Sequence, residues 1–190
     1  AGPFAYELIS GGHSNLTYKV RDAAGREFVL RRQPLGHILP SAHDMGREFR
    51  IISGLFGSTV PVAKPLGLCE DPEVTGGNFY AMDFVDGYIL RAPEDTERDF
   101  PDPARRTPLA HSLIDVLADL HLLDPVDVGL GELGRHEGYI ERQLRRWQRQ
   151  WEDSKTRELP AIDEVHDLLN ANVPPQQRVS IVHGDYRLDN

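Results

Sequence analysis

The chain has 190 residues, of which 39% are hydrophobic and 27% charged, and its 30 acidic residues outnumber 21 basic ones for a net charge of −9. These fractions are typical of a globular protein, and the length suffices for one core or for two small lobes that share a cleft. The acidic balance disfavours nucleic acid and anionic membranes as partners, because both attract basic residues. The sequence contains no apolar run long enough to span a membrane and shows no signal-peptide pattern, so we expect no membrane partner either.

The single cysteine, Cys69, excludes an internal disulfide and favours a reducing compartment, so we expect a cytoplasmic protein. The sequence begins with Ala1 rather than Met and ends at Asn190 within a polar motif. We therefore expect a fragment of something longer.

The first third of the chain predicts strands joined by turns. Its apolar stretches are short, partly alternating and rich in aromatic and β-branched residues, at 4–10, 16–22, 27–33, 60–71 and 78–87. Between the third and fourth of these, residues 42–57 carry Phe49, Ile52, Leu55 and Phe56 at helical spacing and predict one helix. Five strands with one inserted helix form a small α+β unit.

The character of the sequence changes near Gly87. Residues 91–108 are polar and proline-rich and predict a surface loop, whereas 111–123, 138–155 and 162–173 have helical periodicity. Val179–Val182 is a short apolar run that predicts a buried strand before Gly184. We expect an N-terminal lobe at residues 1–86, a hinge at 82–87, and an incomplete helical C-terminal lobe at 87–190.

The last eight residues, HGDYRLDN, have a specific spacing. His183, Asp185 and Asn190 match the catalytic loop H-R-D-x-x-x-x-N of kinases, with Gly184 in place of Arg. In that loop the Asp orients the proton of the attacking hydroxyl, and the Asn carbonyl binds a metal that bridges the phosphates. A strand that breaks into a polar surface turn would give a similar sequence, so the loop alone is a moderate signal.

Features elsewhere strengthen the kinase interpretation because they occur in the expected order. The turn GGHSN has glycines that let backbone amides approach an anion, and these amides belong to Gly12, His13, Ser14 and Asn15. Arg31 stands where kinases place the basic residue of strand three, and Glu48 stands where its helix partner lies. The segment MDFVDG stands where a hinge would bind adenine.

These motifs resemble those of the aminoglycoside phosphotransferase and choline kinase-like superfamily, whose loop reads HGDxxxxN. The chain looks most similar to the branch associated with acyl-CoA dehydrogenases at GGHSNLTY, VLRR, GHILPSAHDMGREFRI, YIERQLRRWQRQWEDSK and VHGDYRLDN. The resemblance covers the whole chain and implies a protein-kinase-like two-lobed fold with a five-stranded antiparallel sheet. It implies a small-molecule kinase that uses ATP and Mg²⁺, a hydroxyl-bearing substrate, and an acyl-CoA dehydrogenase as a functional neighbour.

The resemblance also implies roles for individual residues. Asp185 is similar to the catalytic base, Asn190 to a magnesium ligand, and Arg187 to the cation that neutralises charge in the transition state. Met82 resembles the residue at the back of the adenine pocket, with backbone groups of Asp83 and Val85 bonding the base. Among substrates, the branch suggests a hydroxylated acyl compound over an aminoglycoside.

Two departures from the family pattern leave alternatives open. Arg31 replaces a lysine, so a planar fork stands where a flexible ammonium is usual. The second metal-binding Asp of the family would follow Asn190 and has no counterpart here. Both features would suit a non-catalytic nucleotide-binding or interaction module, whereas a hydrolase with His183 and Asp185 as metal ligands would leave GGHSN and VLRR without a role.

Overall fold

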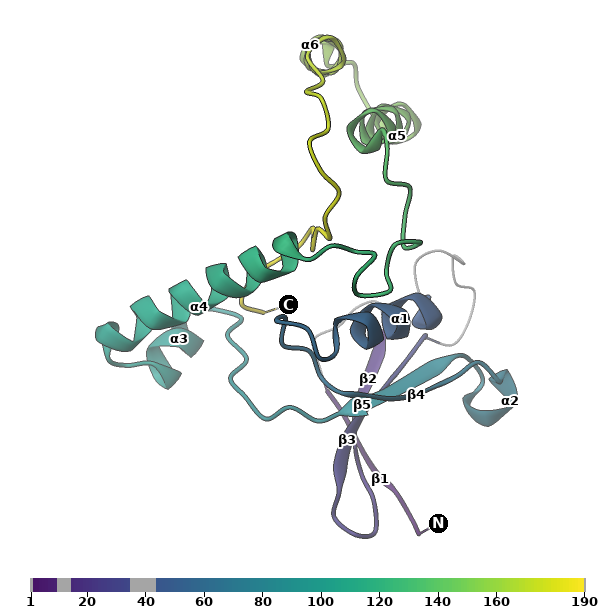
Figure 1. Cartoon of the computed structure of the whole chain (residues 1–190), viewed down its shortest axis with the longest axis vertical. Helices are drawn as coiled ribbons and strands as arrows, with labels where there is room; N and C mark the ends of the chain where they lie inside the picture. The colour runs from purple at the N-terminus through teal and green to yellow at the C-terminus, as the bar shows by residue number, and fades with distance from the viewer. Residues whose placement is uncertain (1, 10–14, 35–43, 190) are drawn as a thin grey trace.

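The computed structural model describes residues 2–9, 15–34 and 44–189 (Figure 1). One antiparallel sheet contains five strands in the order β1-β2-β3-β5-β4. Their bounds are Ala5–Leu8 for β1, Leu16–Arg21 for β2, Glu27–Arg32 for β3, Pro65–Cys69 for β4 and Phe79–Asp83 for β5. The predicted five-stranded antiparallel sheet is therefore confirmed.

Helix α1, Met45–Leu55, lies between β3 and β4 in the chain and packs on β4 and β5. The carboxylate of Asp44 caps its first turn by accepting a hydrogen bond from the amide of Arg47 at 2.8 Å. Met45 and Leu55 are buried. Phe56 was expected on the same apolar face, but it lies beyond the last helical residue and is 48% exposed.

The remaining helices are short α2 at Pro72–Thr75, α3 at Pro93–Asp99, α4 at Pro103–Leu122, α5 at Tyr139–Ser154 and α6 at Pro160–Ala171. The prediction of a loop across 91–108 was wrong, because this stretch forms α3 and the start of α4. Proline is tolerated in the first turn of a helix, where its missing N–H costs nothing, and both helices begin with one. Asp95 completes the start of α3 by accepting hydrogen bonds from the amides of Arg91 and Ala92.

Residues 179–182 form no strand, so that prediction was also wrong. An apolar run becomes a strand only when a neighbouring strand satisfies its backbone groups, and the sheet ends at β1 and β4. The segment instead has no regular secondary structure, and Ile181 packs against the hydrophobic core.

The hydrophobic core joins the sheet-side helix to the helical part of the chain. Leu55 of α1, Val60, Leu120 of α4 and Leu130 form its buried centre. Gly54 permits this approach, because a β-carbon there would lie 2.6 Å from the carbonyl oxygen of Val128. Helix α1 is thus held between the sheet and residues 126–133.

Helices α5 and α6 pack on each other and stand apart from the sheet (Figure 1). Gln148 of α5 lies 3.3 Å from the carboxylate of Asp163 of α6. Trp147, Val165 and Leu168 are more than half exposed on this pair. Across the described parts of the chain, none of the helices is both long enough and apolar enough to cross a lipid bilayer.

Candidate functional site: a polar row under helix α1

Three polar side chains form a row across the centre of the sheet. In the strand register, Thr17 of β2 lies opposite Arg31 of β3, and Arg31 lies opposite Tyr80 of β5. Residues that are directly opposite in neighbouring strands point to the same face, so the row faces a single side of the sheet. The hydroxyl of Thr17 accepts a hydrogen bond from Nη1 of Arg31 at 3.1 Å.

Glu48 of α1 closes this row from above. Its Oε2 accepts from Nε of Arg31 at 2.8 Å and from the Tyr80 hydroxyl at 3.1 Å. Its Oε1 accepts from the side-chain amide of Asn15 at 2.8 Å. The expected pairing of Arg31 with Glu48 is therefore confirmed, and one carboxylate connects α1 with β3, β5 and the residue that precedes β2.

Burial gives this ion pair more weight than a surface pair. About a third of each side chain is exposed, 33% for Arg31 and 32% for Glu48, whereas Tyr80 is 3% exposed. Burial, reinforced by the Glu48 charge, raises the pKa of Tyr80 well above its ordinary value, while Arg31 opposes the shift. Tyr80 therefore remains a neutral hydroxyl that donates to Glu48 at physiological pH.

The turn expected to bind phosphates lies only partly within the described residues. Gly12, His13 and Ser14 lie outside the described residues, whereas Asn15 is described and is 6% exposed. Because Asn15 immediately precedes β2 and donates to Glu48, the carboxyl side of the turn is tied to α1. Whether the turn contacts a nucleotide stays a prediction.

The segment predicted as a hinge leaves the sheet at the end of β5. Met82 lies opposite Val29 of β3 and Pro65 of β4. The amide of Asp83 already donates to the carbonyl of Lys64 at 2.8 Å. Val85 is 67% exposed, so any backbone contact from this segment to a base would begin beyond the sheet edge.

The predicted catalytic loop is anchored on α4 through an aromatic residue. The hydroxyl of Tyr186 donates to the carbonyl of Leu113 at 2.9 Å, and desolvation raises the pKa of Tyr186. The His183 ring packs edge-on against Tyr186 with centroids 5.2 Å apart. His183 therefore packs within the loop against the residue that anchors it.

Two carboxylates flank Arg187 in this loop. Its Nε lies 2.9 Å from Asp189 and 3.8 Å from Asp185, whose side chain is 72% exposed. Asn190, the predicted magnesium ligand, lies outside the described residues. Carboxylate and amide oxygens suit Mg²⁺ in type, although residues 2–9, 15–34 and 44–189 contain no cluster of three His, Cys, Asp or Glu placed to hold a metal.

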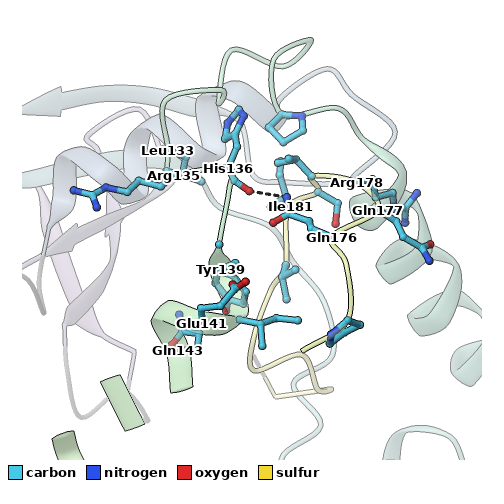
Figure 2. Close-up of a pocket in the computed structure, with 18 of the residues that line it drawn as sticks. Leu133, Arg135, His136, Tyr139, Glu141, Gln143, Gln176, Gln177, Arg178 and Ile181 are labelled. Atoms are coloured by element: carbon cyan, nitrogen blue, oxygen red, sulfur yellow. Dashed lines mark hydrogen bonds between the residues drawn. The ribbon is translucent and has the colours of Figure 1, made fainter. Parts of the chain in front are cut away.

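A large hollow, of about 920 Å³, lies away from the polar row. Its walls are residues 133–143 and 173–182, and Figure 2 shows the hydrogen bond from Gln176 to the carbonyl of His136 that joins them, at 2.6 Å. Arg47 of α1 also lines it. Among the predicted site residues that the structure describes, none lines it.

The second hollow, of about 500 Å³, adjoins the catalytic loop. Residues 186–189 form one wall and residues 90–93 another, with Thr96 and Leu113 between them. Of the predicted site residues within 2–9, 15–34 and 44–189, Arg187 lines it. The hollow is thus an open space next to the side chains expected to perform the chemistry.

Sequence reasoning missed Thr17 and Tyr80. Both are common residue types in strands, and only the register of the three central strands places them beside Arg31. The sequence carries no local signal for either residue, because register is set by pairing between strands that are far apart in the chain.

Comparisons with known proteins agree with this architecture. Over its whole length the chain is 38% identical to acyl-CoA dehydrogenase family member 10 of Mus musculus and 37% identical to family member 11 of Gallus gallus. It spans only 17% and 24% of these two relatives. The crystal structure of a proposed aminoglycoside phosphotransferase from Ralstonia eutropha superposes on the whole chain with a TM-score of 0.82 at 38% identity, and the match covers 54% of that protein.

A family model, the phosphotransferase enzyme family, matches residues 5–190. The match includes the strands that carry Thr17, Arg31 and Tyr80, the helix that carries Glu48, and the loop that carries Asp185. The structural neighbour matches the whole chain in fold and is also 38% identical to it in sequence. The chain therefore has a kinase-like α+β fold and belongs to the phosphotransferase enzyme family.

Proposed function

We propose that the chain is the nucleotide-binding and catalytic-loop region of a small-molecule kinase that passes the γ-phosphate of ATP to a substrate hydroxyl. In this proposal residues 1–86 form the nucleotide lobe and residues 87–190 belong to the catalytic lobe, with 82–87 as the hinge. The observation that carries the proposal is the Arg31–Glu48 ion pair at 2.8 Å, placed on the sheet face beneath α1.

Arg31 supports the proposal because its guanidinium is oriented. Nε and Nη1 are held by Glu48 and Thr17, whereas Nη2 has no hydrogen bond within the described part of the chain. A guanidinium is always charged and binds phosphate oxygens well, so Arg31 can serve in place of lysine. The backbone amides at 12–15 and the backbone at 83–85 complete the proposed nucleotide site.

The catalytic loop would supply the transfer chemistry. Asp185 would orient the substrate hydroxyl and take its proton, and Arg187 would stabilise the charge on the transferring phosphoryl group. Asn190 would hold Mg²⁺, which neutralises phosphate charge when it is bound. Asp185 is exposed enough to meet a substrate, and its neighbour Arg187 borders the 500 Å³ hollow.

For the acceptor we propose a hydroxylated acyl compound. The larger hollow has an apolar lining that includes Leu133, Ile140 and Ile181, with Arg47 and Arg178 among its basic residues. Such a lining suits an apolar chain that carries an anionic end. Two relatives are named as acyl-CoA dehydrogenase family members, which supports an acyl-CoA dehydrogenase as functional neighbour, and we propose a cytoplasmic location.

A non-catalytic nucleotide-binding module is the alternative, favoured by arginine at position 31. The two proposals differ in phosphoryl transfer. The test is to purify the natural protein that contains this chain, supply Mg²⁺ and γ-labelled ATP, and screen hydroxylated acyl compounds, aminoglycosides and choline for label transfer. ATP binding without transfer to any acceptor would favour the alternative.

The matched variant is Asp185→Ala. Loss of a group that acts mainly in the transition state should lower kcat by about a thousandfold or more, while the Kd for ATP changes less than about threefold. The control is Asp127→Ala, an acidic residue on an exposed turn outside the motif. Parallel losses of nucleotide affinity and rate in Asp185→Ala would instead assign Asp185 a structural role.

A further inference from the structure

We infer that Thr17 and Tyr80 are positioning residues that clamp the Arg31 guanidinium, so that the nitrogen left over, Nη2, faces the nucleotide phosphates. The inference rests on the proposed function and adds two residues to which the sequence motifs assign no role.

The row of Thr17, Arg31 and Tyr80 fixes the position of the arginine on one face of the sheet. Thr17, Arg31 and Tyr80 are successive cross-strand neighbours on β2, β3 and β5, the three central strands. Their spacing is set by backbone hydrogen bonds of the ladder, which are far stiffer than a surface contact. The Thr17 hydroxyl, 3.1 Å from Nη1, therefore holds one end of the guanidinium fork.

Glu48, which Tyr80 holds in place, fixes the other end of the Arg31 guanidinium. Within the described part of the chain, Tyr80 makes no hydrogen bond to Arg31 itself but shares Oε2 of Glu48 with it, at 3.1 Å from the Tyr80 hydroxyl and 2.8 Å from Nε of Arg31. Because Tyr80 is 3% exposed and packs its ring on Phe49 at 6.0 Å, its hydroxyl has a fixed position. Tyr80 thus holds Glu48, and Glu48 holds Nε of Arg31.

The third guanidinium nitrogen, Nη2, explains why arginine can occupy the position where kinases have lysine. A lysine ammonium is a single point charge and would have to divide its donors between Glu48 and phosphate. The planar guanidinium uses Nε and Nη1 for the protein and keeps Nη2 in the same rigid plane. Thr17 and Tyr80 are therefore specific to the arginine form of the site, and their loss should affect phosphate binding rather than base binding.

The test measures Kd for ATP, ADP and AMP on the natural protein that contains this chain, by calorimetry. Thr17→Val keeps the shape and removes the acceptor, Thr17→Ser restores it, and Tyr80→Phe removes only the hydroxyl. Loss of one charge-assisted hydrogen bond corresponds to about a tenfold change. We expect Thr17→Val and Tyr80→Phe to raise the Kd for ATP by about three- to tenfold and to change the Kd for AMP by less than about twofold. Thr17→Ser should restore the wild-type Kd for ATP.

Controls separate this inference from the function on which it rests. Tyr6→Phe on the exposed strand β1 and Thr107→Val on exposed α4 should leave all three affinities unchanged. Equal losses for ATP and AMP in Thr17→Val and Tyr80→Phe, with lowered melting temperatures, would show a structural role and overturn the inference. If Arg31→Ala weakens the binding of ATP but not of AMP, while Thr17→Val and Tyr80→Phe bind ATP normally, the inference is wrong and the proposed nucleotide site is retained. If Arg31→Ala changes none of the three affinities, the proposed nucleotide site itself is wrong.

Discussion

Glu48 is the residue on which the polar row depends, because donors from Asn15, Arg31 and Tyr80 converge on one carboxylate. Glutamine at this position would present an NH₂ group to one of these donors. A buried or half-buried donor that loses its acceptor costs about 1–3 kcal/mol.

We therefore expect Glu48→Gln to destabilise the domain by about 2 kcal/mol. For a domain of this size that corresponds to a fall in melting temperature of about 4–8 °C by scanning calorimetry. Glu73→Gln is the matched control, because Glu73 is exposed in the first turn of α2 and should change the melting temperature by less than about 2 °C. Equal shifts in both variants would mean that the three contacts contribute nothing measurable.

Tyr80 should make the stability of the domain depend on pH in the alkaline range. Its pKa is raised in the folded protein, so between the unfolded value of about 10 and the higher folded value the folded state binds more protons. Stability contributed by the neutral hydroxyl is thus complete below pH 10 and is lost as the pH rises above it. We expect the melting temperature of the wild type to fall more steeply above pH 10 than that of Tyr80→Phe, in parallel thermal scans from pH 8 to 11. Parallel slopes would contradict this account of Tyr80.

At the scale of elements, the contact of α1 with residues 126–133 depends on a glycine. A β-carbon at Gly54 would lie 2.6 Å from the Val128 carbonyl oxygen and 2.8 Å from Leu130. The nearest obstacle is backbone, which cannot rotate away as the tip of a side chain can. Helix α1 would have to move outward to accept alanine.

Gly54→Ala should therefore destabilise the domain by about 1–3 kcal/mol through overpacking, although alanine favours the helix by about 1 kcal/mol. Gly46, in the same helix, is the matched control, because a β-carbon there would meet only side-chain oxygens at 3.4 and 3.5 Å. Gly46→Ala should be neutral or slightly stabilising. Urea titration of both variants decides the matter, and a stabilised Gly54→Ala would show that the helix moves without cost.

The same scale shows how far the sequence could predict the structure. The first five strands and α1 were predictable because alternation and helical spacing are local signals. Helix α3 was missed because its prolines and acids were taken as loop composition, although Pro93 at the start and Arg98 in the last turn are also helix signals. The strand expected at 179–182 failed because pairing partners are a property of the fold and not of the run.

The candidate site, like the fold, could be predicted from the sequence only in part. The motif order predicted the Arg31–Glu48 pair, since each residue is defined by its element. Thr17 and Tyr80 could not be predicted, because strand register decides which residues on β2 and β5 lie opposite Arg31. The roles of Gly12, His13, Ser14 and Asn190 lie outside the described residues and stay predictions.

At the scale of the whole molecule, the sheet and the α5–α6 pair should differ in local stability. Strands β2, β3 and β5 have neighbours on both sides, whereas α5 and α6 pack mainly on each other (Figure 1). Local opening costs little where few buried contacts must break. We expect amides within 139–171 to exchange with deuterium at least about tenfold faster than those of β3, by mass spectrometry at neutral pH. Comparable protection in the two regions would mean that other contacts hold the pair in place.

The position of α1 has a thermodynamic consequence. Neighbouring residues of this helix face two different places, since Glu48 holds the polar row and Arg47 lines the larger hollow. A molecule bound in the hollow that displaced α1 would alter the affinity for nucleotide by some factor. Linkage requires that nucleotide then alter the affinity for that molecule by the same factor, in the same direction. Titration of nucleotide with the hollow empty or occupied, and titration of the hollow's ligand with nucleotide absent or bound, would therefore give the same coupling free energy. That free energy would be a property of the helix and not of either ligand.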